Sequence, residues 1–561
     1  MSRRPIANLV GACCALLCAL LPATATPVAH AAVTMPDVQI TRPISIKISG
    51  ELAQGGRVGA AVFTPDGTTV VFEARRSNTT TVELLTVPAR GGPIRQLSAT
   101  LACSAAHPCF LLTPDGDRVV YRNGGPDPIA TAGVELFSIP IGGGAATKLS
   151  GPLPDSGNYR NVEHYEISAD GNHVLFVAPL PGGNSTALFR VPITGGAPVQ
   201  LSTGHDAPAF PFRFQLSADG STAVYATARD IYAVPVADGP AVKLNDPIPA
   251  NMEVDLLVVS SDGSRVVYRV VESIGGGDRT ASLHSVPSGG GAVTMLAQGA
   301  TGPRFIDLSP PNPFILPDVS ITPDGGRVLF LLKESKNGPV ELFSIPTGGG
   351  SATKLNPPLA STSGSLGVFG HGLAPDGNTV VFAARQALSE GDALYTVPAG
   401  GGTPVNLSGA TDVNSRILPQ AVSPDASRVV YTTGEFTGGE ILRTLLVVPM
   451  VGGQPQQLGP TLMQDRLIIN ARFTPDGATV IYRAELEAKG RAELLRIPVA
   501  GGAPVKLNGP LTAGGEVTAY VISPDGATVV YRADQAVDNR FELFSVVDGG
   551  ALLLPLLHWA D

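Results

Sequence analysis

Ser523-Pro524-Asp525-Gly526-Ala527-Thr528-Val529-Val530-Tyr531 joins a tight turn to a β-strand, and relatives of this stretch recur along the chain. Proline presets φ, aspartate accepts hydrogen bonds from the backbone that follows it, and glycine adopts positive φ, so Pro-Asp-Gly is turn chemistry. The β-branched and aromatic run after it is typical of a strand. Ten such stretches recur about every fifty residues, a period that indicates a propeller-type array. Their turn aspartates are Asp66, Asp115, Asp170, Asp219, Asp262, Asp324, Asp376, Asp425, Asp476 and Asp525.

Each period carries the same order of signals after the turn. A variable polar segment leads to a second strand that ends in an apolar-proline pair such as Val397-Pro398, where proline is tolerated because it stands at a strand end. A glycine pair such as Gly401-Gly402 turns the chain, a short strand ends in a leucine such as Leu407, and an alternating strand such as 517–522 leads to the next turn. Four strands and two tight hairpins in each period predict a propeller blade.

The array resembles the TolB-type propeller repeat, a WD-like blade with a Ser/Thr-Pro-Asp-Gly turn, two strands, Gly-Gly and leucine. The resemblance covers almost all of the chain after residue 31 and implies an all-β fold. Ala169, Ala218 and Ser261 stand where the motif has proline, and Ala426 stands where it has glycine. TolB carries an additional N-terminal α/β domain that has no counterpart here, so a Tol-Pal role is not implied.

The sequence predicts a β-propeller of about ten four-stranded blades. Two five-bladed propellers in tandem are the alternative, because the widest interval, from Asp262 to Asp324, divides the turns five and five. We favour one ring, since the blade signals continue across that interval without a long linker. Residues 47–56 resemble residues 506–515, so the chain begins partway through a repeat. Either residues 44–48 or residues 551–557 are expected to close the ring.

The N-terminus has the features of a secretory signal. Arg3 and Arg4 precede an apolar run from Leu9 to Leu21, and small residues lead up to Ala31. We therefore expect residues 1–31 to be a signal peptide, residues 32–561 to form the propeller, and the protein to be exported to a periplasm or to the extracellular space.

Composition limits the classes of partner. Hydrophobic residues make up 43% of the chain and charged residues 15%, which is enough apolar surface for a large core. The formal net charge is −9 and basic clusters are absent from the sequence, which argues against a nucleic-acid partner. No stretch after residue 31 has the ~18 uninterrupted apolar residues of a membrane span. We expect a monomer.

Two cysteines, Cys103 and Cys109, remain after the signal peptide. In an oxidising compartment a local disulfide between them is expected. A metal pair with His107 is the alternative, but two thiols and one imidazole form an incomplete site.

The sequence predicts no catalytic, cofactor-binding or metal-binding residue. It contains no Gly-x-Ser-x-Gly elbow and no His-Glu-x-x-His motif. The ten aspartates are interpreted as turn formers, and residues 485–489 as a solvated loop. Histidines without ligand spacing are interpreted as isolated loop or strand residues, although an acid–base or metal site built from them stays open. These are His107, His164, His173, His205, His284, His371 and His558.

Two functions are compatible with the sequence. The first is an exported non-enzymatic scaffold that binds a protein, peptide or glycan through its variable loops, such as residues 122–132, because binding residues concentrate on loops of a rigid scaffold. The second is a hydrolase or lyase that acts on a polysaccharide in the central channel, which rests on analogy with other propellers. A prolyl-oligopeptidase-like enzyme is excluded by the lack of a hydrolase domain.

Overall fold

A computed structural model describes residues 43–77, 81–102, 109–124, 133–154, 161–182, 185–202, 213–237, 239–275, 278–300, 319–333, 338–437, 440–463 and 466–547. The chain divides into two compact units, Met1–Arg42 and Pro43–Asp561, and all described residues belong to the second. Every regular element in the described residues is a β-strand. No helix long and apolar enough to cross a membrane occurs among them. The expected signal peptide, residues 1–31, lies outside the described residues.

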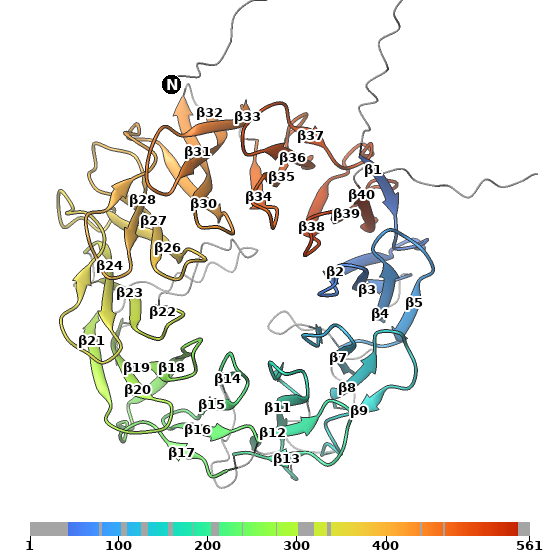
Figure 1. Ribbon diagram of the computed structural model, residues 1–561, viewed down its shortest axis with the longest axis vertical. Helices are drawn as coiled ribbons and strands as arrows, with labels where there is room; N and C mark the ends of the chain where they lie inside the picture. Colours follow the sequence, from blue (N-terminus) through green and yellow to red (C-terminus); the bar gives the residue numbers. More distant parts are fainter. Residues whose placement is uncertain are drawn as a thin grey trace, which may run out of the picture. The chain divides into compact units, whose positions relative to one another are not determined.

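The strands form ten groups of four, which we number as blades from the N-terminal side (Figure 1). Blades 6 and 7 are joined into one eight-stranded sheet by a single parallel bridge between Val340 and Gly367. Blade 1 contains β2 (Arg57–Phe63), β3 (Thr69–Arg75), β4 (Glu83–Pro88) and β5 (Arg95–Ser98). Blade 2 contains β6 (Phe110–Leu112), β7 (Arg118–Asn123), β8 (Glu135–Pro140) and β9 (Thr147–Lys148). Blade 3 contains β10 (Tyr165–Ile167), β11 (His173–Pro179), β12 (Thr186–Pro192) and β13 (Val199–Gln200). Blade 4 contains β14 (Arg213–Leu216), β15 (Thr222–Ala226), β16 (Ile231–Pro235) and β17 (Val242–Lys243). Blade 5 contains β18 (Met252–Val259), β19 (Arg265–Gly275), β20 (Asp278–Pro287) and β21 (Thr294–Ala300).

The second half repeats the pattern. Blade 6 contains β22 (Val319–Ile321), β23 (Arg327–Lys333), β24 (Val340–Pro346) and β25 (Thr353–Lys354). Blade 7 contains β26 (Gly367–Leu373), β27 (Thr379–Arg385), β28 (Ala393–Pro398) and β29 (Val405–Asn406). Blade 8 contains β30 (Arg416–Val422), β31 (Arg428–Thr437), β32 (Glu440–Pro449) and β33 (Gln456–Leu462). Blade 9 contains β34 (Ile468–Phe473), β35 (Thr479–Ala484), β36 (Glu493–Pro498) and β37 (Val505–Lys506). Blade 10 contains β38 (Val517–Ile522), β39 (Thr528–Ala533), β40 (Glu542–Val547) and, from the N-terminal side, β1 (Ile44–Lys47).

The two kinds of tight turn lie on one face of the ring. In blade 9 the backbone N–H of Val499, before the glycine pair, donates to the carbonyl of Ala478 in the Asp-Gly turn at 2.9 Å. Gly501 adopts a φ of 91°, which is available to glycine at little steric cost. We call this side the turn face. The connections from second to third strands and the loops between blades lie on the opposite side, the loop face.

The apolar core lies between neighbouring blades. Ten clusters of buried side chains each join two consecutive blades, including blade 5 with blade 6 and blade 10 with blade 1. Val530 and Leu543 of blade 10, for example, pack in one cluster with Val70 and Leu85 of blade 1. These ten junctions confirm one ring of ten blades, and the alternative of two five-bladed rings is wrong.

The ring is closed by β1, which pairs antiparallel with β40 from Ile44 opposite Val547 to Lys47 opposite Phe544. Lys47 forms an ion pair with Glu542, the counterpart of the pair between Lys506 and Glu493 within blade 9. The N-terminal strand thus supplies the fourth strand of blade 10, and residues 44–48 are the one of the two candidate segments that closes the ring. The other candidate for closure, residues 551–557, lies outside the described residues.

Candidate functional site

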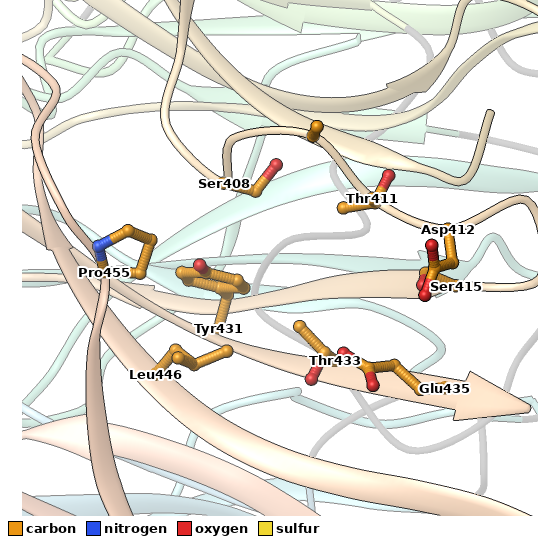
Figure 2. Close-up of a pocket in the computed structure, with 10 residues that line it drawn as sticks. Ser408, Thr411, Asp412, Ser415, Tyr431, Thr433, Glu435, Leu446 and Pro455 are labelled. Atoms are coloured by element: carbon orange, nitrogen blue, oxygen red, sulfur yellow. The ribbon is translucent and has the colours of Figure 1, made fainter. Parts of the chain in front are cut away.

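A pocket of about 260 Å³ lies on the loop face between blades 7 and 8 (Figure 2). One wall is the loop at residues 407–415 that leads from blade 7 to blade 8, and the other is formed by β31, β32 and the turn before β33. Its lining residues are Ser408, Ala410, Thr411, Asp412, Ser415, Tyr431, Thr433, Glu435, Leu446 and Pro455.

The loop wall is held in place by a buried carboxylate of blade 7. Asp392 is 4% exposed, and its Oδ1 lies 3.1 Å from Nε of Arg385 and 3.2 Å from Nη1 of Arg416. The backbone N–H of Asp392 donates to the carbonyl of Ser415 at 3.0 Å, and the hydroxyl of Thr411 donates to the carbonyl of Asp392 at 2.9 Å. These bonds fix the loop before any ligand arrives, which lowers the entropy cost of binding.

The opposite wall carries a buried tyrosine with an unused hydroxyl. The ring of Tyr431 is 1% exposed and packs in the apolar cluster between the blades with Leu394 and Leu407. Burial raises the pKa of Tyr431, so the hydroxyl stays protonated at neutral pH. No hydrogen bond joins this hydroxyl to any part of the chain that the structure describes, although Tyr431 lines the pocket. Because Tyr431 lines the pocket, a ligand bound there can reach this hydroxyl and form a hydrogen bond with it.

Blade 10 shows how the same space is filled elsewhere. Tyr531 occupies the place of Tyr431, and Phe544 opposite it stacks on its ring with centroids 5.3 Å apart. The Tyr531 hydroxyl lies 2.5 Å from the hydroxyl of Ser45 and 2.7 Å from Oε1 of Gln535, and it accepts from the backbone N–H of Gly509 at 3.2 Å.

Blade 8 carries different side chains at those places. Leu446 lies opposite Tyr431, where blade 10 has an aromatic ring. Pro455 is the counterpart of Ser45. Pro455 stands two residues before the residue that pairs with Leu446, and Ser45 stands two residues before the residue that pairs with Phe544. Glu435 takes the place of Gln535, four residues after the tyrosine. The pocket therefore arises where a stacked ring and two hydrogen-bond partners are absent.

The charge in the pocket is negative. Asp412 and Glu435 contribute carboxylates from opposite walls, and both side chains are exposed. Lysine, arginine and histidine are absent from the described residues that line the pocket.

The ten turn aspartates are engaged within their own turns. In the first turn the hydroxyl of Thr64 donates to Oδ1 of Asp66 at 2.5 Å, and the backbone N–H of Thr68 donates to the same oxygen at 3.1 Å. These hydrogen bonds lower the pKa of Asp66. A second pocket, of about 220 Å³ on the turn face, includes Asp476 and Asp525, whose carboxylates are occupied in the same way.

The histidines do not converge. His164 Nε2 lies 3.5 Å from Oε1 of Glu166 beside the inner strand of blade 3, whereas His371 is buried on β26 of blade 7. His284 stacks on Tyr268 in blade 5. His107, His205 and His558 lie outside the described residues. In the described part of the chain no group of three or more His, Cys, Asp or Glu side chains could hold a metal ion.

Cys109 is disulfide-bonded. Cys103, its expected partner, lies outside the described residues, so the pairing of Cys103 with Cys109 stays a prediction.

Glu487 and Lys489 are exposed, as the solvated-loop interpretation predicts, but Glu485 and Arg122 differ from what the sequence indicated, and residues 125–132 lie outside the described residues. Glu485 is 6% exposed and accepts backbone N–H groups from Leu467 and Gly490, each at 2.9 Å, so it organises a loop instead of lying in solvent. Arg122 lies in strand β7, is 5% exposed, and donates to the carbonyl of Glu163 in the next blade at 3.2 Å. The local sequence could not show the burial of either side chain, because the N–H of Leu467 and the carbonyl of Glu163 that bind them come from other segments.

No protein-family model matches the sequence, and no curated protein sequence matches it. Solved structures of low identity are similar to it. A eukaryotic initiation factor is 12% identical with a TM-score of 0.44, over 76% of this chain and 93% of that chain. Dipeptidyl peptidase 4 of Porphyromonas gingivalis is 12% identical with a TM-score of 0.40, over 77% of this chain and 56% of that chain. A structure assigned to TolB from Agrobacterium tumefaciens is 17% identical with a TM-score of 0.25, over 45% of this chain and 81% of that chain.

The chain is a β-propeller. That statement rests on its blades and on the closure of the ring. The finer resemblance to the TolB-type repeat stays a prediction.

Proposed function

We propose that this protein is an exported, non-enzymatic β-propeller that binds a protein, peptide or glycan partner through its loop face. The pocket between blades 7 and 8 supports this proposal, because it lies on the loop face, its loop wall is fixed by Asp392, and it offers the unused hydroxyl of Tyr431. Few, well-placed polar groups in a pre-formed hollow are the usual features of a binding site.

Exposed apolar side chains occur on the loop face of the same blades. Val413 on the loop between blades 7 and 8 is 42% exposed, Phe436 at the end of β31 is 58% exposed, and Met463 after β33 is 56% exposed. Leu388, in the connection between β27 and β28, is 57% exposed. Aromatic residues and methionine are enriched at protein interfaces, so this region favours a macromolecular partner over an isolated small molecule.

Partner capture from a cell-envelope extract, with protein that begins at Ala32, tests the proposal. A specific protein or polysaccharide should be retained by the native chain, and retention should fall when Phe436 and Val413 are changed to Ser. The matched control changes Val242 and Met295, exposed apolar residues of blades 4 and 5, to Ser. Equal retention by the native protein and by the loop-face variant would contradict binding at this face.

The second candidate function is a hydrolase or lyase that acts on a polysaccharide in the central channel, and residues of blade 3 favour it. Glu166 lies on the inner strand β10 beside His164, and burial raises the pKa of both Glu163 and Glu166. A carboxyl group whose pKa is raised by burial and that lies beside a histidine suits general acid–base catalysis. Cleavage of a polysaccharide by the native chain that is lost in Glu166→Gln would establish this candidate, and no cleavage across a polysaccharide panel would exclude it.

Export is tested by intact mass. Expression with residues 1–31 present should yield a secreted product whose N-terminus is Ala32. A cytoplasmic product that retains Met1 would contradict the exported part of the proposal.

A further inference from the structure

We infer that the pocket between blades 7 and 8 binds the alkylammonium group of a lysine side chain presented by the partner. This inference rests on the proposed binding function and specifies the chemistry of one contact within it.

The hydrogen-bonding groups of the pocket match an ammonium group. An ammonium group carries three donors and no acceptor. Asp412 and Glu435 supply carboxylate acceptors from opposite walls, and the hydroxyl oxygen of Tyr431 supplies a third acceptor at the buried wall. Figure 2 shows the Tyr431 ring between the loop that carries Ser408 and the side chain of Leu446. A cation can therefore be surrounded by acceptors without displacing a protein cation, since the described lining contains none.

The apolar part of the pocket suits the stem of the same side chain. Leu446 and Pro455 line the side formed by the outer strands of blade 8. Lysine places its methylene stem along apolar surface while its charged head seeks acceptors. The volume of about 260 Å³ accommodates one long side chain but not a folded domain element.

A neutral sugar fits less well. Sugars are commonly bound against the open face of an aromatic ring, but the ring of Tyr431 is buried in the apolar cluster between the blades. Only its hydroxyl remains available to a ligand. The two carboxylates would also be left without a counter-charge.

The test is a titration of the chain from Ala32 followed by saturation-transfer NMR, with three small probes. Nα-acetyl-lysine N-methylamide is expected to bind in the millimolar range, since one ammonium in a half-open acidic pocket gives weak affinity. Nα-acetyl-norleucine N-methylamide, which has the same stem without the charge, should bind at least about fivefold more weakly. Methyl glucoside should not compete with the lysine probe.

Variants of the pocket locate the site. Glu435→Gln places the blade 10 residue in blade 8 and should weaken lysine binding by about fivefold. Leu446→Phe introduces the ring that fills the same space in blade 10, and it should abolish binding while the blade stays folded. Glu253→Gln removes an exposed carboxylate of blade 5 and is the control, with no expected change in affinity.

The outcomes separate the inference from the function on which it rests. Equal binding of the norleucine and lysine probes, or displacement of the lysine probe by methyl glucoside, would overturn the lysine assignment. A captured partner released by Leu446→Phe would still support the binding function in that case. Lysine binding that depends on Glu435 would support the proposed chemistry of the pocket. If partner capture were nevertheless unaffected by Leu446→Phe and by the loop-face changes, the proposed binding function of the loop face would be contradicted.

Discussion

Hydroxyl and carboxyl groups hold each turn, and proline is not required. In the turn at Asp170, which has Ala169 in place of proline, the hydroxyl of Ser168 donates to Oδ1 of Asp170 at 2.5 Å. The backbone N–H of Gly171 donates to the carbonyl of Ser168 at 2.8 Å, and the same bonds form in the turn that contains Pro524. The proline lowers the entropy of the unfolded chain, whereas the hydrogen bonds define the folded turn.

Ala426 is expected to be a strained turn residue. It adopts a φ of 56° where the other nine turns have glycine, and the left-handed conformation costs an alanine ~1 kcal/mol. Ala426→Gly should therefore raise the free energy of unfolding by up to about 1 kcal/mol. Thermal unfolding measures the change, and Gly477→Ala, at a φ of 68° in blade 9, should lower the midpoint by a similar amount. A midpoint that falls in Ala426→Gly would contradict the strain.

We expect Asp170 to make the stability of the folded protein sensitive to acid. Hydrogen bonds from Ser168 and Asn172 lower the pKa of Asp170 from 3.8 to about 2. A carboxyl whose pKa is lower in the folded protein contributes stability above its unfolded pKa, and this contribution disappears as the pH falls from 3.8 towards 2. Asp170→Asn should therefore lower the thermal midpoint near pH 7 and lessen its decline between these two pH values. Parallel profiles for native protein and variant would show that Asp170 is not linked to the decline.

At the scale of the strand, each blade aligns the aromatic residue of its second strand with one residue of its third strand. Aromatic rings or histidine face each other in blades 2, 3, 4, 5, 6, 7 and 10, with Tyr268 and His284, for example, 5.1 Å apart. Leucine takes the third-strand position in blades 1, 8 and 9. The strand register therefore decides where a ring can be missing, and in blade 8 that place opens to solvent as the pocket.

Leu446→Phe should stabilise blade 8. A stacked aromatic pair contributes about 1 kcal/mol beyond its buried area, so the thermal midpoint of a chain of this size should rise by ~1 °C. Scanning calorimetry measures the rise, and Leu495→Phe in blade 9 is the control, because Leu495 is 1% exposed and a larger ring there should destabilise by overpacking. A lower midpoint for Leu446→Phe would show that the pocket cannot accept a ring.

We expect the order of the loop that contains Glu485 to depend on the carboxylate of this one residue. Glu485→Ala leaves the backbone N–H groups of Leu467 and Gly490 without their acceptor, which should cost about 2 kcal/mol. Hydrogen exchange should accelerate at these two amides first. Glu487→Ala, at an exposed neighbouring position, should leave their exchange unchanged, and equal protection in Glu485→Ala would refute the organising role.

At the scale of the whole molecule, the ring depends on contacts between residues about 500 positions apart in sequence. The hydroxyl of Ser49 accepts a hydrogen bond from the backbone N–H of Leu543 at 3.1 Å. In blade 9, Oδ1 of Asn508 accepts the corresponding hydrogen bond from the backbone N–H of Leu494 at 2.8 Å. Arg532 donates to the carbonyl of Gly59 at 3.3 Å across the same junction. Closure thus repeats an ordinary blade contact, with its two halves supplied from opposite ends of the described chain.

Removal of β1 should weaken the ring. A chain that begins at Glu51 lacks Lys47 and Ser49 and exposes β40 as an unpaired edge, which favours association with other chains. Its thermal midpoint should fall by several degrees, and size-exclusion chromatography should show aggregates. A chain that begins at Pro43 keeps β1 and should match the chain from Ala32. An unchanged midpoint after loss of β1 would show that the other junctions alone hold the ring.

The repeated turns and the four strands of each blade could be predicted from the sequence, because turn chemistry and strand alternation are local patterns. The likeness of residues 47–56 to residues 506–515 showed that the chain begins within a repeat, but the sequence left two candidates for the closing strand. The number of rings was decided by the tertiary structure, because the apolar cluster that contains both Val530 and Val70 joins blade 10 to blade 1, and no local sequence pattern contains that junction. The pocket also needed the tertiary structure. Leu446 and Pro455 are unremarkable in the sequence, and they matter only because the register places them around the hydroxyl of Tyr431 and because Asp392 of the neighbouring blade holds the opposite wall.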